Sequence, residues 1–251
     1  MARMPDASSD YLAFAIEQLR NIQQESTGTI HQAAHVVADA LEDGHLLYLF
    51  GSGHSGLAAK EAHGRAGGLV PAIFIEDVMD GDAERVEGMA RLILGRYGLE
   101  AGDVLIVISN SGINAIPVEM AQIAHSKGVT SVAITSVAHS SAVAARHSSG
   151  QKLYEAADIV IDTHSPRGDT VLPVAGSPFR TGSTSSLASI AIVQSIVVQT
   201  VALLTERGIT PPIFVSANVP EGKDHNHAMM AQYQKRLARY QIPLTWEEEK
   251  K

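Results

Sequence analysis

Residues 46–56 read Leu-Leu-Tyr-Leu-Phe-Gly-Ser-Gly-His-Ser-Gly, an apolar run that ends in a short loop of small and hydroxyl-bearing residues. Residues 104–112 repeat the pattern as Val-Leu-Ile-Val-Ile-Ser-Asn-Ser-Gly. Each stretch is typical of a buried strand followed by a tight turn that opens a helix. Helix N-termini carry unpaired backbone N–H groups and partial positive charge, so such turns bind anions. Hydroxyls can also donate to phosphate oxygens, and the two loops together predict one phosphorylated ligand held between them.

The central part of the chain alternates between short apolar runs and stretches with helical spacing. The apolar runs fall at residues 46–50, 72–75, 104–108, 130–134 and 159–162, and the helical stretches at 55–66, 83–97, 115–127 and 138–154. Strands that are apolar throughout are buried on both faces, and their alternation with helices implies a parallel sheet. The sequence therefore predicts an α/β fold, a flavodoxin-like sandwich with a five-stranded parallel sheet between helices. Ligands of such sheets bind beyond the carboxyl ends of the strands, where both loops lie.

The chain divides into three expected parts. Residues 1–44 form an N-terminal helical extension, residues 45–227 the ligand-binding domain, and residues 228–251 a C-terminal helix and tail. Within the domain, residues 163–186 are rich in turn-forming residues and predict a long loop. The apolar stretch 187–204 is interrupted by Gln194 and Gln199, so it predicts a buried core or interface helix rather than a membrane span.

Composition excludes several classes of protein. The net charge of −8 over 251 residues lacks the basic footprint of a nucleic-acid-binding surface. The absence of cysteine excludes disulfides and thiolate chemistry, and it fits a cytoplasmic protein. No signal-peptide core follows the first residues, and no membrane partner is expected. The 11 histidines show no zinc-site spacing, so no metal is expected.

The first loop also matches a dinucleotide-binding fingerprint, Gly51-x-Gly53-x-x-Gly56. Glu76 ends the next apolar run 20 residues after Gly56, where an acid that binds the ribose would lie. This alternative, an enzyme with a nicotinamide cofactor, leaves the second loop unexplained and makes no use of Ser55. The phosphate-binding interpretation requires no cofactor.

The motifs Gly-Ser-Gly-His-Ser and Ser-Asn-Ser-Gly, each at the end of a parallel strand, resemble the sugar isomerase (SIS) domain over about residues 46–204. That family includes phosphoheptose isomerase, N-acetylmuramic acid 6-phosphate etherase and the isomerase half of glucosamine-6-phosphate synthase. The chain is most similar to a group of uncharacterised bacterial SIS proteins, so the resemblance implies the ligand class more firmly than the reaction. It implies a phosphate site formed by Ser109, Asn110, Ser111 and Asn114. It also implies sugar contacts from Ser52, His54 and Ser55, with Thr184 in the hydroxyl-rich loop that closes the pocket.

Glu61 and Arg65 are four residues apart on the helix expected after the first loop, so they share a face. One interpretation is a solvated i,i+4 ion pair. The other is a catalytic carboxylate oriented by a guanidinium that contacts the sugar phosphate. In phosphoheptose isomerases and the etherases the key glutamate falls where this chain has Arg65. The Gln-Glu-x-x-His metal-ligand pattern of phosphoheptose isomerases is also missing after Thr184.

Histidines offer a second candidate for proton transfer. His225 lies just before the last expected helix, where it either marks a solvated helix start or reaches an active site, including that of a partner subunit, to act on the ring oxygen. His54 lies within the first loop and is expected to contact ligand. Roles for His147 and His227 stay open.

The preferred function is a phosphosugar-binding aldose–ketose isomerase acting on a sugar phosphate or amino-sugar phosphate. In this hypothesis Glu61 moves the proton between C1 and C2, and His225 assists. A sugar-phosphate sensor without enzymatic activity is the alternative, although no helix-turn-helix extension is present. The apolar N-terminal helices and the long helix 187–204 predict a homodimer or homotetramer.

Overall fold

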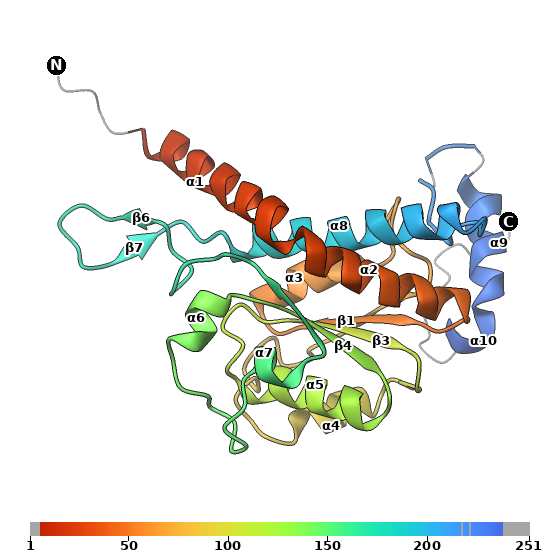
Figure 1. Ribbon diagram of the computed structural model, residues 1–251, viewed down its shortest axis with the longest axis horizontal. Coiled ribbons are helices and arrows are strands. Elements are labelled where there is room, and N and C mark those ends of the chain that lie inside the picture. Colours follow the sequence, from red (N-terminus) through yellow and green to blue (C-terminus); the bar gives the residue numbers. More distant parts are fainter. Residues whose placement is uncertain (1–5, 217, 221, 238–251) are drawn as a thin grey trace, which may run out of the picture.

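The fold centres on a parallel sheet, as a computed structural model of the chain shows for residues 6–216, 218–220 and 222–237. Its strands are β1 (Leu47–Gly51), β2 (Ala72–Ile75), β3 (Val104–Ile108), β4 (Thr130–Thr135) and β5 (Ile159–Asp162). They pair in the order β2-β1-β3-β4-β5, and every pairing is parallel (Figure 1). The five-stranded sheet predicted from the apolar runs is therefore confirmed.

Each sheet face carries its own apolar core, because successive side chains of a strand point to opposite faces. On one face, Leu47 and Leu49 of β1 pack with residues of α2 (Thr27–Glu42), α3 (His54–Glu61) and α8 (Ser185–Glu206). On the other, Tyr48 and Phe50 pack with residues of α4 (Met89–Leu94), α5 (Ala115–Ser126), α7 (Leu153–Ala156), α9 (Gly222–Gln232) and α10 (Gln234–Leu237). The core on the first face is thus aliphatic, and the core on the second combines aliphatic side chains with the aromatic rings of Tyr48 and Phe50.

The N-terminal helical extension is present as α1 (Ala7–Asn21), a short π-helix, η1 (Ile22–Ser26), and then α2. Ala34, Val37 and Leu41 of α2 are buried in the same core as α8 and the sheet. Only the α1 part therefore projects past the sandwich, beside the loop that precedes α8 (Figure 1).

Three expected helices are shorter than their patterns predict. The helix expected over 55–66 ends at Glu61, and Gly64 and Gly67 follow with φ of 65° and 80°, which break a helix. The helix expected over 83–97 is reduced to α4, which begins after Gly88 at φ 87°. The stretch 138–154 forms two short helices, α6 (Val137–Ser141) and α7, separated by a loop.

The turn-rich segment before α8 is ordered around one carboxylate. Asp169 accepts hydrogen bonds from the backbone N–H groups of Thr184 and Ser185 at 3.1 and 2.9 Å and from the Ser185 hydroxyl at 2.6 Å. Between them, β6 (Leu172–Pro173) and β7 (Arg180–Thr181) form an antiparallel hairpin beside α1 (Figure 1). The N-terminus of α8 is therefore fixed by its own preceding loop.

The C-terminal helices dock at the amino edge of the sheet. Arg236 of α10 lies there against the fully buried carboxylate of Asp103, with Nη2–Oδ2 at 2.8 Å.

α8 is the one helix among the described residues long and apolar enough to cross a membrane. Half of its most apolar window is buried, against α2 and α3 among others. That packing is typical of the core helix of a globular protein.

Candidate functional site

The two hydroxyl-rich loops begin side by side at the carboxyl edge of the sheet. Gly51, the last residue of β1, lies opposite Ile108, the last residue of β3. Gly51 also lies directly under the start of α3, because a Cβ there would be 2.6 Å from the backbone carbonyl of Ser55. Two helix N-termini, of α3 and α5, therefore open next to each other, which is the arrangement that the sequence predicts for a phosphorylated ligand.

The second loop is held tightly by its neighbours. The Ser109 hydroxyl accepts a hydrogen bond from the N–H of Gly112, and the Ser140 hydroxyl of α6 donates to the carbonyl of Ser111. Gly112 has φ 62°, and a Cβ there would lie 2.6 Å from Thr135 Oγ1 and 2.7 Å from Ser140 Oγ. No other residue type fits this position, so the conformation of the loop is set before any ligand binds.

Two buried hydroxyls near these helix starts have no hydrogen-bond partner among the described residues. They belong to Ser52 in the first loop, which is 7% exposed, and to Thr184, which precedes α8 and is 1% exposed. α3 packs against α8, and α8 starts at the end of the molecule where β1 ends (Figure 1). An unsatisfied buried hydroxyl costs about 1–3 kcal/mol, so a polar partner at either position would stabilise the fold.

The remaining loop residues present their side chains in different ways. His54 is exposed at the first position of α3, whereas Ser55, Asn110 and Ser111 are half-buried. The Asn110 amide oxygen accepts a bond from the Thr163 hydroxyl at 3.3 Å. The predicted ligand contacts of the two loops are therefore brought together around the paired helix starts.

A buried glutamine of α1 continues this network. Gln18, which is 2% exposed, donates from Nε2 to the carbonyl of Thr163 at 2.8 Å and to the hydroxyl of Ser165 at 2.9 Å. Through Thr163 the N-terminal helix is thus linked to Asn110 of the second loop. The sequence analysis did not identify this role for Gln18, because its partners lie about 145 residues away.

Asn114 connects the second loop to two charged residues that the sequence analysis missed. It precedes α5 and is buried, and its Oδ1 accepts a hydrogen bond from Arg146 Nη1 at 2.7 Å. The same side chain lies near the carboxyl of Glu84. Burial raises the pKa of the Glu84 carboxyl, the neighbouring Asn114 opposes the rise, and charge repulsion from Asp77 adds to it. Glu84 lies in a stretch with a helical pattern, and nothing local in the sequence indicated its partner.

Positive charge also reaches this edge from outside the loops. Burial lowers the pKa of His139 in α6, and Arg167 and Arg146 add to this effect by charge repulsion. The His139 Nδ1 accepts a hydrogen bond from the N–H of Gly168. Neither loop contains a Lys or Arg, but the described contacts place two cations beside the second loop: Arg146, which bonds Asn114, and Lys152, whose Nζ donates to the carbonyl of Ser140 at 2.7 Å.

Glu61 and Arg65 form the ion pair expected from their spacing. Their side chains are 38% and 47% exposed, and Glu61 is the last residue of α3, at the opposite end of that helix from the first loop. The ion-pair interpretation is therefore realised, while the catalytic role of Glu61 and the ligand contact of Arg65 stay predictions.

His225 is not brought to the loops within one subunit. Its Nε2 lies 2.9 Å from the carbonyl of Ile213, and Ile213 forms a β-bridge with Leu69 just before β2, at the amino edge of the sheet. His227 is exposed on α9. A part for His225 in catalysis would therefore require a second copy of the chain.

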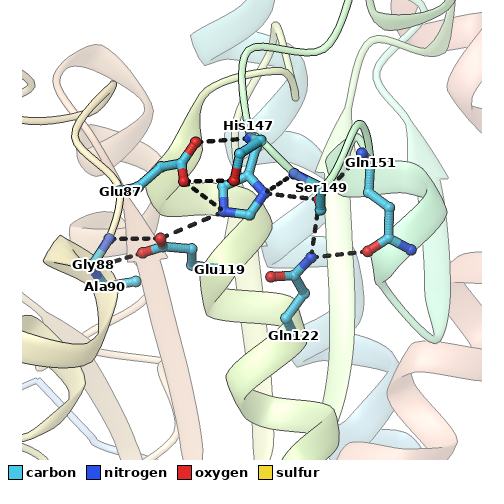
Figure 2. A network of polar contacts seen from close by, with 9 residues as sticks. Glu87, Gly88, Ala90, Glu119, Gln122, His147, Ser149 and Gln151 are labelled. Carbon is cyan, nitrogen blue, oxygen red and sulfur yellow. Dashed lines mark hydrogen bonds and ion pairs between the residues drawn. The ribbon is translucent and has the colours of Figure 1, made fainter.

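His147 belongs to a separate polar network on the outer side of α5 (Figure 2). Its Nε2 lies 3.5 Å from Glu119 and 3.9 Å from Glu87, and its Nδ1 lies 2.7 Å from the Ser149 hydroxyl. Glu119 also accepts bonds from the N–H groups of Gly88 and Ala90 at the start of α4. The network ties three segments together.

No cluster of three or more potential metal ligands occurs among the described residues.

Comparison with known proteins identifies the fold and the family. A family model described as the SIS domain matches residues 10–136. A UPF0309 protein of Listeria monocytogenes is 38% identical over 88% of this chain and 93% of its own length. Among solved structures, phosphoheptose isomerase GmhA from Neisseria gonorrhoeae superposes with a TM-score of 0.57 at 16% identity, covering 78% of this chain and 98% of that one. The Vibrio vulnificus NanR protein complexed with ManNAc-6P gives 0.51 at 15% identity, covering 95% and 71%.

Proposed function

This chain belongs to the SIS-domain family and to the UPF0309 proteins, and from that premise we propose that it binds a phosphorylated sugar at the two hydroxyl-rich loops and isomerises it. The observation that carries the proposal is the register of Gly51 against Ile108, because it sets two helix N-termini beside each other. Because strands and helices alternate, the carboxyl ends of the other strands lie along the same edge of the sheet, and the loops that follow them form the rest of the site.

The phosphate is assigned to the second loop. Ser109, Asn110, Ser111 and Asn114 surround the start of α5, and the loop is already fixed around Gly112. The sugar hydroxyls are assigned to Ser52, His54 and Ser55 on one side and to Thr184 on the other. The unpaired hydroxyls of Ser52 and Thr184 support this assignment, because a polyol can both donate to them and accept from them.

The proposed reaction is the interconversion of an aldose phosphate, or an amino-sugar phosphate, with the corresponding ketose phosphate. The phosphate binding energy positions the reacting carbons, so the protein needs no cofactor. Glu61, on the helix that follows the first loop, is the carboxylate that we assign to the proton transfer. The GmhA structure, a phosphoheptose isomerase, supports this class of reaction through the shared fold.

A sensor is the second candidate, because one structural neighbour is NanR in complex with ManNAc-6P. A sensor binds a phosphosugar without changing it. The two candidates therefore differ in one measurable property, the exchange of the C1 or C2 hydrogen of the bound sugar with solvent.

The charge of the chain and the packing of α8 indicate which partners to expect. The net charge of −8 argues against a nucleic acid, and α8 packs as a core helix rather than as an anchor. We place the protein in the cytoplasm as a homodimer or homotetramer, in which exposed apolar residues of α1 and α8 are covered.

A thermal-shift screen tests the proposed function. Hexose, hexosamine and heptose phosphates are compared with the same sugars without phosphate, and calorimetry follows each hit. We expect stabilisation by a phosphosugar and none by its unphosphorylated counterpart. Equal stabilisation by both, or stabilisation by a nicotinamide dinucleotide alone, would contradict the proposal.

A further inference from the structure

Thr163, the residue that directly follows β5, is held by its main chain on both sides. It is fully buried, and its N–H donates to the carbonyl of Thr135 in β4 at 2.9 Å. Its own carbonyl accepts a hydrogen bond from Nε2 of Gln18 in α1 at 2.8 Å, and Gln18 is itself 2% exposed. These bonds fix the point from which the Thr163 hydroxyl projects.

The two hydrogen bonds of the Thr163 hydroxyl have only one consistent direction. The backbone N–H of Ser165 lies 3.3 Å from Thr163 Oγ1, and a backbone N–H can only donate. The proton of the hydroxyl is therefore left for Asn110 Oδ1, which also lies at 3.3 Å. If the Asn110 amide were reversed, this proton would have no acceptor among the described residues, which is unfavourable for a buried hydroxyl.

The orientation set by Thr163 leaves Nδ2 as the free end of the Asn110 amide. Asn110 is half-buried in the second loop, and its Nδ2 makes no hydrogen bond to another described residue. Its main chain is also held, because its carbonyl accepts a bond from the N–H of Ser136 at 3.1 Å. An amide –NH2 can only donate, whereas an amide oxygen can only accept. The free end of Asn110 is therefore suited to an acceptor such as a phosphoryl oxygen.

We propose that Thr163 is a positioning residue for the phosphosugar, because it holds the Asn110 amide with Nδ2 toward the phosphate. The proposal rests on the proposed function, which assigns the phosphate to the second loop. Thr163 does not touch the ligand and acts through Asn110. A sugar hydroxyl both donates and accepts, so it can bond either end of an amide, whereas an anionic phosphate is attracted by one end and repelled by the other. Thr163 therefore supports selection of phosphorylated over unphosphorylated sugars.

Asn110→Asp tests which end of the amide faces the ligand. Thr163 can still donate to one carboxylate oxygen, while the second oxygen replaces Nδ2 and carries negative charge. We expect the Kd for the phosphosugar to rise about 100-fold or more, since a donor is lost and like charges are brought together. The probes are the hexose, hexosamine or heptose phosphate that stabilises the wild type and the same sugar without phosphate, measured by calorimetry. Affinity equal to or tighter than wild type in Asn110→Asp would overturn the proposed orientation.

Thr163→Val tests the positioning itself, because valine keeps the shape and removes the hydroxyl. An amide that is free to turn presents Nδ2 for only part of the time, so the Kd for the phosphosugar should rise at least about 2-fold. The affinity for the unphosphorylated sugar should not change. Thr163→Ser keeps the hydroxyl and should restore the wild-type Kd. Thr200→Val is the matched control, because that buried hydroxyl donates within α8, to Ile196; it should bind as the wild type does.

A double-mutant cycle separates positioning from a general structural role. Asn110→Ala removes the amide that Thr163 holds, so adding Thr163→Val to Asn110→Ala should leave the Kd unchanged. If Thr163 acted only by supporting the fold, Thr163→Val would weaken binding to the same extent in both backgrounds, and that result would overturn the proposal. Thermal melting of each variant confirms that the protein titrated is folded. Should Thr163→Val not fold, Thr163→Ser and Asn110→Asp still test the proposal.

Failure of this inference differs from failure of the proposed function. If Asn110→Ala weakens phosphosugar binding and Thr163→Val does not, the positioning role of Thr163 is wrong and the phosphate site stands. If Asn110→Ala binds as tightly as the wild type, Asn110 does not contact the phosphate and the inference is wrong, although the protein still binds a phosphosugar. A wild-type protein that binds none of the phosphosugars would overturn the proposed function and this inference together.

Discussion

At the scale of single residues, the hydroxyls of Ser52 and Thr184 are informative, because they are buried without a hydrogen-bond partner in the part of the chain that the structure describes. The resemblance to the SIS domain implies both residues as sugar contacts. The patterns could not identify Glu84 or Arg146, since these meet Asn114 across about 30 residues of chain. Contacts of that kind depend on the path of the backbone and leave no local periodicity.

Thr184→Val should make the ligand-free protein more stable. The substitution keeps the shape and removes an unsatisfied buried hydroxyl, which is worth about 1 kcal/mol or more and about 2–4 °C in Tm for a chain of this size. Ligand-induced stabilisation should fall at the same time. Calorimetric melting with and without phosphosugar measures both. Thr200→Val is the control, because that hydroxyl is buried in the same helix and already donates to Ile196; a similar gain there would contradict the argument.

Ser111→Ala should weaken binding of any phosphosugar. It removes a donor to a charged acceptor, at a cost of about 1–3 kcal/mol or roughly 5- to 150-fold in Kd. Ser141→Ala, at an exposed position of α6, should leave the affinity unchanged. Isothermal titration calorimetry measures the Kd of each variant. Unchanged affinity in the double variant Ser109→Ala/Ser111→Ala would place the phosphate elsewhere.

At the scale of elements, strands were predicted more accurately than helices. Five apolar runs are strands within one residue of their expected bounds, because a strand buried on both faces needs an uninterrupted apolar run. Helical spacing misled at 83–97, where Gly88 at positive φ delays the start of the helix, and at 138–154, where a loop that contains Gly150 at positive φ separates two short helices. Propensity is weak evidence when turns compete.

Docking of α10 should depend on one buried ion pair. Arg236→Met leaves the carboxylate of Asp103 buried without its cation and should lower the free energy of unfolding by about 3 kcal/mol. Asp103→Asn combined with Arg236→Met should recover part of the loss, because no charge then remains buried. Denaturant titration of both variants and of Asp103→Asn completes a double-mutant cycle, and additive effects would show that the pair does not couple.

At the scale of the whole molecule, α1 and α8 carry exposed apolar residues beside a shared groove. Leu12 and Ile16 of α1 are 60% and 50% exposed, and Val198 of α8 is 67% exposed. A groove of about 670 Å³ between these helices is lined by Ile16 and Val198 among others. We expect a second copy of the chain to cover this face.

Light scattering at micromolar concentration should therefore give twice or four times the chain mass of 26.6 kDa. Val198→Glu places a charge in the apolar face and should shift the mass toward one chain without loss of secondary structure. Glu206→Gln, at the end of the same helix, is the matched control. A wild-type mass of one chain would contradict the homodimer and homotetramer alike.

The π-helical turn η1 has a consequence for how this gene can vary. Such a turn holds one residue more than an α-helical turn, which is the result expected when a single codon is inserted into the gene of a regular helix. A π turn and an α turn complete about the same rotation, so deleting the codon of Gln24, which is exposed, would let the helix run on as regular α-helix with α1 in nearly the same orientation. Gln18 should then keep its bond to Thr163, and with it the link from the N-terminus to the second loop. We therefore expect selection for activity to tolerate a single-codon deletion within 22–26 and to reject one within α2, where each residue lost rotates α1 by about 100°.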